Sequence, residues 1–213
     1  MADILRSSLK QMDIPFTDAM IGQLERHLEE IRLFNPSYKL VSDPYNTWIT
    51  RHVLDSLSGY HVIRDEARQD FSVADLGSGA GFPGVPLAIM MPDIRFTLVE
   101  RMGRRAGFLK NVLATTGLYN RTSLIFSDVR QVNEKFDMVV MRAFHPLYDI
   151  AAISSALLTP NGSILAYKAT DAYLNDELDE LERRLPGKFK AQIIEVAVPG
   201  LKGQRKLCLL KFR

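Results

Sequence analysis

Two patterns of hydrophobic and polar positions divide the chain near residue 60. Before it, apolar residues recur every three or four positions, which predicts amphipathic helices. After it, short apolar runs alternate with longer amphipathic stretches, which is typical of strands alternating with helices in an α/β fold. We therefore expect residues 1–60 to form a helical N-terminal extension and residues 61–213 to form one compact domain.

Local signals give the predicted helices of the extension their ends. Thr17 can cap a helix through its hydroxyl. Pro36 and Pro44 are expected to act as stops, because proline lacks the backbone N–H that a helix interior uses. Residues 44–58 predict a further helix, with Asp43 as its possible cap.

Apolar runs in the second part of the chain predict a seven-stranded sheet, with strands at residues 71–76, 95–100, 123–126, 136–142, 162–168, 191–198 and 206–212. Helices fit between the first five runs and again around residues 172–185, which favours parallel strands joined by crossovers. Only the short stretch PGLKGQR separates the last two runs, which suits a hairpin. The expected fold class is α/β, with a mostly parallel sheet and an antiparallel last strand.

Composition and charge narrow the class of protein. The 213 residues are 46% hydrophobic and 24% charged, as in an ordinary soluble globular protein, and we expect a cytoplasmic monomer without a membrane segment. Cys208 is the single cysteine, so neither a disulfide framework nor a thiolate metal cluster is expected, and we predict no metal site. Basic residues gather at 183–213 and at 101–110, which fits either a polyanion-binding face or solvated surface.

A glycine-rich loop, DLGSGAGFPGVPLAI, follows the first predicted strand and opens a helix. Gly77, Gly79 and Gly81 would let the backbone turn tightly and approach a ligand. In open α/β sheets, ligands bind beyond the carboxyl ends of the strands. We expect the loop to line such a site.

Acids stand at three successive strand ends near this loop. Asp75 directly precedes the loop, Glu100 follows Gly77 by 23 residues, and Asp128 comes shortly after the third strand. Glu100 has the spacing of a carboxylate that binds ribose hydroxyls, and Asp128 is placed to face an adenine amine. An acid at Asp75 suits a ligand with a positive end, so S-adenosylmethionine is favoured over a dinucleotide. Plain strand-end capping is the alternative for each acid.

The motifs resemble those of the ribosomal RNA small-subunit methyltransferase G family, also called glucose-inhibited division protein B. The resemblance rests on the loop together with RHVLDSL, FTLVE, KNV, MRAF, AYK and the C-terminal P-x-L-x-x-x-R, and it covers most of the chain. It implies a class I, Rossmann-like methyltransferase fold that uses S-adenosylmethionine. It further implies methylation of nitrogen 7 of a guanine in small-subunit (16S) ribosomal RNA, with that RNA or the small ribosomal subunit as partner.

The resemblance also assigns roles to residues. It places Gly77 and Phe82 against the cofactor, Val129 and Arg130 beside the adenine, and Arg142 after the fourth strand. This chain departs from the family at several positions, which are Lys39, Val41, Arg130, Met141 and Ala169.

Nitrogen 7 of guanine carries a free lone pair, so methyl transfer requires placement more than a general base. Arg142 is the candidate catalytic residue and also a candidate cofactor-binding residue, because at the ligand edge of the sheet it could orient the cofactor or the guanine; an ion pair closing the strand end is the alternative. Phe144 could stack on a base or simply pack.

Candidate RNA-binding residues lie outside the loop, at Arg51, His52, Lys168, Lys202, Arg205 and Lys206. Arg51 and His52 can share a helical face with Asp55, either for RNA or as a structural network. Lys168 could meet phosphate or a neighbouring acid. Alternative functions are a methyltransferase for another RNA, a protein or a small molecule, a nicotinamide-dependent oxidoreductase, and a non-catalytic RNA-binding module.

Overall fold

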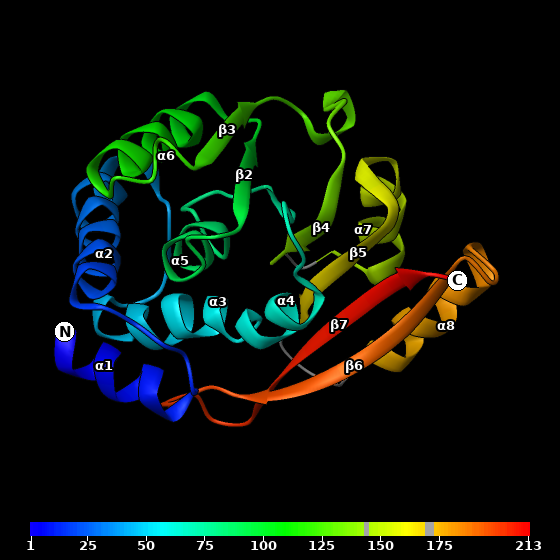
Figure 1. Cartoon of the computed structure of the whole chain (residues 1–213), viewed down its shortest axis with the longest axis horizontal. Helices are drawn as coiled ribbons and strands as arrows, with labels where there is room; N and C mark the ends of the chain where they lie inside the picture. The colour runs from blue at the N-terminus through cyan, green and yellow to red at the C-terminus, as the bar shows by residue number, and fades with distance from the viewer. Residues whose placement is uncertain (143–144, 169–172) are drawn as a thin grey trace.

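The computed structural model describes residues 1–142, 145–168 and 173–213, apart from the side chain of Gln204. Its strands form one sheet in the order β3-β2-β1-β4-β5-β7-β6 (Figure 1). The strands are β1 (Ser72–Leu76), β2 (Arg95–Glu100), β3 (Thr122–Phe126), β4 (Phe136–Met141), β5 (Leu158–Lys168), β6 (Phe189–Ala197) and β7 (Gln204–Phe212). Strand β7 runs antiparallel to both of its neighbours, and the other pairs are parallel. The predicted fold class is confirmed.

Helices cover both faces of this sheet. The longer helices are α1 (Ala2–Gln11), α2 (Asp18–Tyr38), α4 (Tyr60–Glu66), α5 (Gly84–Met90), α6 (Gly103–Thr115), α7 (Leu147–Ser154) and α8 (Leu174–Arg184). Short helical segments are η1 (Tyr45–Thr47), η2 (Ile49–Leu54), α3 (Asp55–Leu57), η3 (Val129–Gln131) and η4 (Ser155–Leu157). In Figure 1, α7 and α8 lie on the side away from α2, α5 and α6.

Alternation along the strands divides the apolar residues between two cores. In β4, Met138 and Val140 pack with the N-terminal helices, α5 and α6, whereas Val139 and Met141 pack with α7 and α8. The first core contains Leu5 and Leu28, so the N-terminal helices share one hydrophobic core with the sheet. The division of the chain at residue 60 stays a prediction.

The N-terminal helices differ from expectation at Pro36. Thr17 caps α2 as predicted, since its Oγ1 accepts the N–H of Met20 at 3.3 Å. Helix α2 nevertheless continues through Pro36 and ends only at Lys39, in the left-handed conformation at φ 50°. The Asn35 side chain holds this exit, because it donates to the carbonyl of Val41 and accepts its N–H.

Residues 45–57 form a nearly continuous helical segment, as expected, but with several windings. Segment η1 is a 3₁₀-helix and η2 is a π-helix of six residues, which carries Arg51 and His52. The predicted cap at Asp43 is wrong, because Pro44 precedes η1 and no side chain caps it. The Asp43 side chain instead faces Arg51 and His52.

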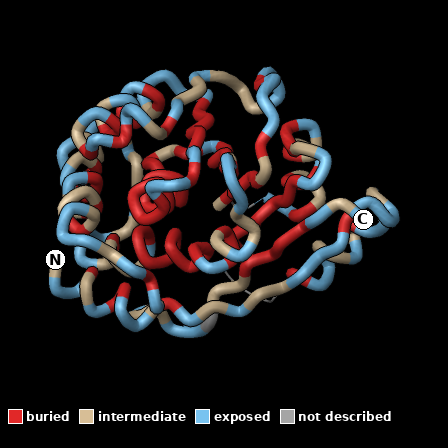
Figure 2. Tube along the Cα trace, in the orientation of Figure 1, coloured by how far each residue is buried: buried red, intermediate tan, exposed pale blue. Residues whose placement is uncertain are grey.

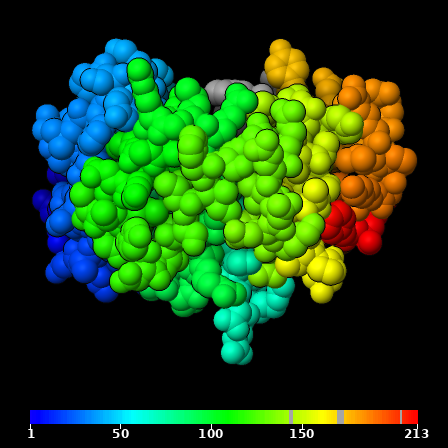
Figure 3. Space-filling view, turned by 90° about the horizontal axis from the view of Figure 1, so that it is seen from above, coloured from blue at the N-terminus to red at the C-terminus, as the bar shows by residue number. Residues whose placement is uncertain are grey.

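The helix that follows the glycine loop lies in the interior of the molecule. Every residue of α5, the helix that the loop opens, is buried, and Figure 2 shows it within the red interior. The view from above in Figure 3 shows the middle of the chain between the N-terminal helices and the C-terminal segments. Within the described residues, no helix combines the length and apolarity needed to cross a membrane.

Candidate functional site

The predicted site residues gather where the parallel strands end. Asp75 and Glu100 lie at the carboxyl ends of β1 and β2, and Lys168 ends β5. Arg142 directly follows the last residue of β4. These four strands are consecutive in the sheet, in the order β2-β1-β4-β5, and run parallel, so their carboxyl ends lie at one edge. Open α/β sheets place ligand sites there.

The glycine loop between β1 and α5 has the backbone that its composition predicts. Gly77, Gly79 and Gly81 have φ values of 72°, 57° and 89°. A Cβ on Gly77 would meet no atom within 4 Å, so the backbone there borders open space. The main chain is therefore open to a ligand at Gly77, whereas Gly81 is buried and packs against Val85 and His27.

Asp75 is buried beneath the loop, with only 1% of its surface exposed. Its Oδ2 accepts the N–H of Gly84 at 3.0 Å, whereas its Oδ1 is buried without a partner among the described residues. Burial raises the pKa of Asp75 to about 6, although the N–H of Gly84, the Ser78 hydroxyl and the charge of Arg142 each act to lower it. A buried carboxylate oxygen without a donor is costly, so this atom suits a cationic ligand group.

Glu100 holds the loop from the neighbouring strand. Its Oε2 accepts the N–H of Gly79 at 2.9 Å, and its Oε1 accepts the N–H of Met102 at 2.8 Å. The side chain is buried, with 3% exposed. Each carboxylate oxygen can accept more than one bond, so the contact with Gly79 leaves acceptor capacity for hydroxyl groups.

Asp128 caps η3, directly after β3. This agrees with the alternative role for this acid, which was capping at a strand end. Its Oδ1 accepts the N–H of Arg130 at 3.0 Å. The Arg130 side chain is 79% exposed, and Val129 is half-buried. Residues 128–130 therefore form a capped turn after β3, with Val129 packed against the core that includes α7 and α8.

Phe82 lies at the centre of a ring cluster rather than at the surface. Its ring stacks on His52, with centroids 5.0 Å apart, and lies 4.9 Å from the ring of His27. The guanidinium of Arg142 stands over the same ring, 5.1 Å from its centroid. Phe82 thus links the glycine loop to η2, α2 and the end of β4.

His27 was not among the predicted site residues. Its Nε2 lies 2.8 Å from the carbonyl oxygen of Ala80, which can only accept, so this nitrogen carries the hydrogen. Burial lowers the pKa of His27 to about 4 and keeps the ring neutral. A single histidine on the apolar side of a helix gives no signal of this contact in the sequence.

Arg142 is held on three sides. Its Nη1 donates to the carbonyl of Arg51 at 3.2 Å and to Oδ2 of Asp55 at 3.1 Å. Its Nη2 lies 3.2 Å from Nδ1 of His52, which must accept because guanidinium only donates. Burial, and then the charge of Arg142, lower the pKa of His52 to about 4. His52 is therefore a neutral partner.

Asp55 joins two arginines from distant strands. It pairs with Arg142 through Oδ2, and its Oδ1 lies 2.6 Å from Nε of Arg205 in β7. The structure thus forms the structural network that was one reading of RHVLDSL. Arg51 stays mostly exposed, with 57% of its side chain accessible, and pairs with Asp43 at 3.2 Å.

The predicted lysines have different surroundings. Lys168 is 10% exposed and pairs with Glu177. Of the two partners considered from the sequence, phosphate or a neighbouring acid, the structure shows an acid. Lys206 lies 2.7 Å from Glu195 on the neighbouring strand. Lys202 is exposed in the connection between β6 and β7. Of these three, Lys202 alone is fully on the surface.

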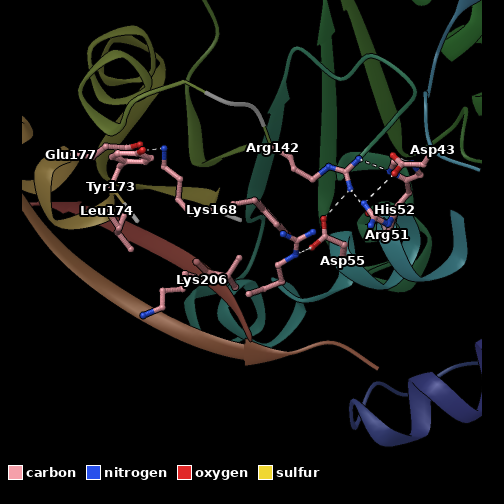
Figure 4. A pocket seen from close by; sticks show the side chains of 13 residues that line it. Asp43, Arg51, His52, Asp55, Arg142, Lys168, Tyr173, Leu174, Glu177 and Lys206 are labelled. Carbon is pink, nitrogen blue, oxygen red and sulfur yellow. Dashed lines mark hydrogen bonds and ion pairs between the residues drawn. The ribbon is translucent and has the colours of Figure 1, made fainter. Parts of the chain in front are cut away.

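Two cavities meet at Arg142. A cavity of 240 Å³ is bordered by the glycine loop and Phe82, and one of 420 Å³ by Tyr167, Lys168, Glu177 and Arg205. Asp43, His52 and Arg142 line both. Figure 4 shows Arg142 pointing toward Asp55 and Asp43 at one end of the larger cavity, with Lys168 and Glu177 at the other.

The remaining predictions concern Phe144, the positions where this chain departs from the family pattern, and metal binding. Phe144 and Ala169 lie outside the described residues. Val41 borders the smaller cavity, Lys39 is exposed at the end of α2, and Met141, the last residue of β4, is buried in the core with α7 and α8. Across residues 1–142, 145–168 and 173–213, no group of three His, Cys, Asp or Glu could hold a metal ion.

Comparison with known proteins gives a consistent result. The rRNA small subunit methyltransferase G family profile matches residues 20–208. Ribosomal RNA small subunit methyltransferase G of Haemophilus influenzae is 35% identical, over 97% of this chain and 98% of that protein.

Solved structures agree on the fold. A putative O-methyltransferase from Klebsiella pneumoniae has a TM-score of 0.62 at 14% identity, over 99% of this chain and 96% of that one. The TYW2 protein of M. jannaschii, solved in complex with AdoMet, has a TM-score of 0.52 at 16% identity, over 73% and 76% of the two chains.

Proposed function

The chain belongs to the rRNA small subunit methyltransferase G family, and on that premise we propose that it methylates nitrogen 7 of a guanine in small-subunit ribosomal RNA. S-adenosylmethionine would supply the methyl group. The observation that carries the proposal is the buried Asp75 with one unpartnered oxygen, beneath a glycine loop that borders open space. This arrangement fits a ligand that is cationic at one end and lies against the main chain.

Residues that line the smaller cavity, such as Gly77, Gly79 and Phe82, would bind the cofactor together with the acids at the neighbouring strand ends. Asp75 and the backbone of Gly77, Gly79 and Gly81 would hold the sulfonium and the amino group. Glu100 would accept the ribose hydroxyls while it keeps Gly79 in place. Phe82, which lies under Arg142, would contact the cofactor near its methyl group, and the adenine end would lie toward the turn formed by residues 128–130.

The chemistry of nitrogen 7 matches the groups at the junction of the two cavities. Guanine N7 carries its lone pair in the neutral base, so no proton has to be removed before it attacks the methyl group. His52 is neutral and already accepts from Arg142, so it is not placed as a general base. Arg142 borders both cavities and is fixed by Asp55 and Arg51, which suits orientation of the base.

The acceptor would enter the larger cavity as a base turned out of its strand, as RNA-modifying enzymes require. Arg51 at the mouth of this cavity and Lys202 on the hairpin are exposed cations that would contact the phosphate backbone. Three further residues line the cavity but already have protein partners: Arg205 and Lys206 form ion pairs, and His52 stacks on Phe82. We propose that they shape the wall around the acceptor base and do not bind phosphate. We propose a monomer acting in the cytoplasm on this RNA or on the small subunit.

A labelling experiment tests this function. The protein is incubated with S-adenosylmethionine labelled in its methyl group and with undermethylated small subunits or their naked RNA. The modified nucleotide is then mapped by mass spectrometry. Label on N7 of one guanine supports the proposal, whereas label on an exocyclic amine, on ribose, on protein or nowhere contradicts it.

A further inference from the structure

We propose that Lys168 and Glu177 recognise the Watson–Crick edge of the target guanine and thereby turn its N7 toward Arg142. This inference rests on the proposed function and adds to it the groups that select guanine. Glu177 was not among the residues predicted from the sequence. Both residues line the larger cavity, at the end away from Asp43 (Figure 4).

The pair is fixed in place at the sheet edge. Lys168 at the end of β5 donates to the carbonyl of His145 at 2.7 Å, and its Nζ lies 2.5 Å from Oε2 of Glu177 in α8. The same Oε2 accepts the N–H of Leu147, the first residue of α7, at 3.0 Å. Groups from two other elements, β5 and α7, therefore hold one oxygen of Glu177.

Hydrogen-bonding capacity remains on both members of the pair. The described residues direct no hydrogen bond to Oε1 of Glu177, although its side chain is only 23% exposed. Lys168 has three N–H donors, and its bonds to His145 and Glu177 use two. One acceptor and one donor thus lie side by side on the wall of a 420 Å³ cavity, within the size range of small-ligand sites.

This combination matches guanine and opposes adenine. The Watson–Crick edge of guanine presents the O6 acceptor beside the N1–H and N2–H donors. Lys168 would donate to O6, and Oε1 of Glu177 would accept from N1 and N2. Adenine presents a donor at N6 and an acceptor at N1, which would place like groups together and leave them unpaired.

The orientation of the base then follows from its shape. N7 lies on the five-membered ring, across the purine from N1 and N2. A guanine held in this way would point N7 away from Glu177, on the edge that also carries O6, and toward the wall where His52 and Arg142 separate the two cavities. The mostly exposed ring of Tyr173 and the buried side chain of Leu207 also line this cavity, and they give a base apolar surface to pack against.

Inosine provides the sharpest test, because it lacks only the N2 amino group. The guanine mapped as the target is replaced by inosine in otherwise identical RNA, and kcat/KM is measured for both substrates. We expect the wild type to lose about tenfold or more on inosine, since a hydrogen bond to a charged group carries at least that factor. Glu177→Gln should lose activity on guanine by a similar factor and should discriminate less between the two bases.

A matched variant controls for changes in α8. Glu180→Gln lies on the same helix and pairs with Arg183 and Arg184, so it should keep the wild-type preference. All three proteins should bind S-adenosylhomocysteine equally, which shows that the cofactor site is intact. Equal wild-type rates on guanine and inosine, or an undiminished preference in Glu177→Gln, would overturn the inference while leaving the proposed function standing.

If the wild type does not methylate guanine N7, the proposed function fails separately. Binding of guanosine and inosine monophosphates to the protein saturated with S-adenosylhomocysteine then decides the inference. Tighter binding of the guanosine nucleotide, lost in Glu177→Gln, supports recognition of the base. Equal binding, or none, overturns it.

Discussion

Asp55 and Asp75 are both buried acids at the same edge of the sheet, yet their partners differ completely. Asp55 has an arginine on each oxygen, with Arg142 at 3.1 Å and Arg205 at 2.6 Å. Asp75 has one backbone donor, Gly84, and its second oxygen has no partner among the described residues. The Asp55 carboxylate joins two segments of the protein. The Asp75 carboxylate keeps one oxygen that can still accept a hydrogen bond or an ion pair from a ligand.

The presence or absence of protein partners distinguishes a structural acid from a ligand-binding acid, whereas burial does not, since both side chains are buried. A buried charge whose partners are all present stabilises a particular arrangement and is costly to break. A buried charge that lacks a partner reduces stability unless a ligand supplies one. The predictions below test this contrast, beginning with the largest expected effect.

Removing the charge of Asp55 should damage the framework most. Asp55→Asn would leave Arg142 and Arg205 without their shared counter-charge, and we expect the free energy of unfolding to fall by about 3–5 kcal/mol. Urea denaturation measures this change. Asp65→Asn, an exposed acid on α4, serves as the control and should change stability by less than about 0.5 kcal/mol. An equal effect of the two substitutions would contradict the framework role.

Glu100 combines both roles, because its two oxygens hold backbone amides while it is assigned to ribose. Glu100→Gln places an amide N–H against the N–H of Gly79 or Met102. We expect the dissociation constant for S-adenosylmethionine to rise at least about tenfold, with about 1–2 kcal/mol lost in stability. Calorimetric titration and thermal unfolding give the two values. An unchanged dissociation constant would remove the ribose assignment.

Asp75→Asn should weaken cofactor binding without weakening the fold. Because burial raises the pKa of Asp75 to about 6, from 3.8, the folded state holds this proton more tightly than the unfolded chain. The sign follows: this contribution to stability is present below about pH 4 and is lost as pH rises through about 6. The variant should therefore be at least as stable as the wild type at pH 8.

Cofactor binding should show the opposite dependence on pH. A cationic ligand needs the ionised Asp75, so wild-type affinity should rise between about pH 5 and pH 7 and exceed that of Asp75→Asn by about tenfold at pH 8. The pKa of both His27 and His52 is lowered to about 4, so neither changes charge in this range. Parallel pH profiles for the two proteins would exclude Asp75 as the binding group.

The smallest effect is expected at the exposed cation on the hairpin. Lys202→Ala should weaken RNA binding about two- to threefold. The slope of the logarithm of the binding constant against the logarithm of the salt concentration should become shallower by about one, which corresponds to the loss of one phosphate contact. Filter binding at several salt concentrations measures the slope. Lys10→Ala, an exposed lysine in α1, should leave the slope unchanged. A slope that is the same with and without Lys202 would remove this contact.

The sequence was most informative where local pattern decides structure. Alternating apolar runs predicted the strands because strand spacing follows side-chain burial, although β5 begins at Leu158, before the predicted residue 162. Glycine composition predicted the positive φ values of the loop. Pro36 misled because a proline near the end of α2 is tolerated when Asn35 bonds the following backbone.

Long-range pairing could not be predicted from local pattern. The contacts of Asp55 with Arg142 and Arg205 join residues from α3, the end of β4 and β7. Likewise, the acid that meets Lys168 could be named only from the structure, because α8 brings Glu177 to the end of β5. The sequence predicted which residues carry charge at the sheet edge, but not which of those charges are already neutralised.

The structure of the complex with S-adenosylmethionine tests the central claim most directly. We predict that its adenosyl group lies over the glycine loop, with Asp75 as the carboxylate nearest the sulfonium and amino groups. The methyl group should face the larger cavity beside Arg142. A cofactor bound away from the loop, or one whose cationic end is turned from Asp75, would contradict the account.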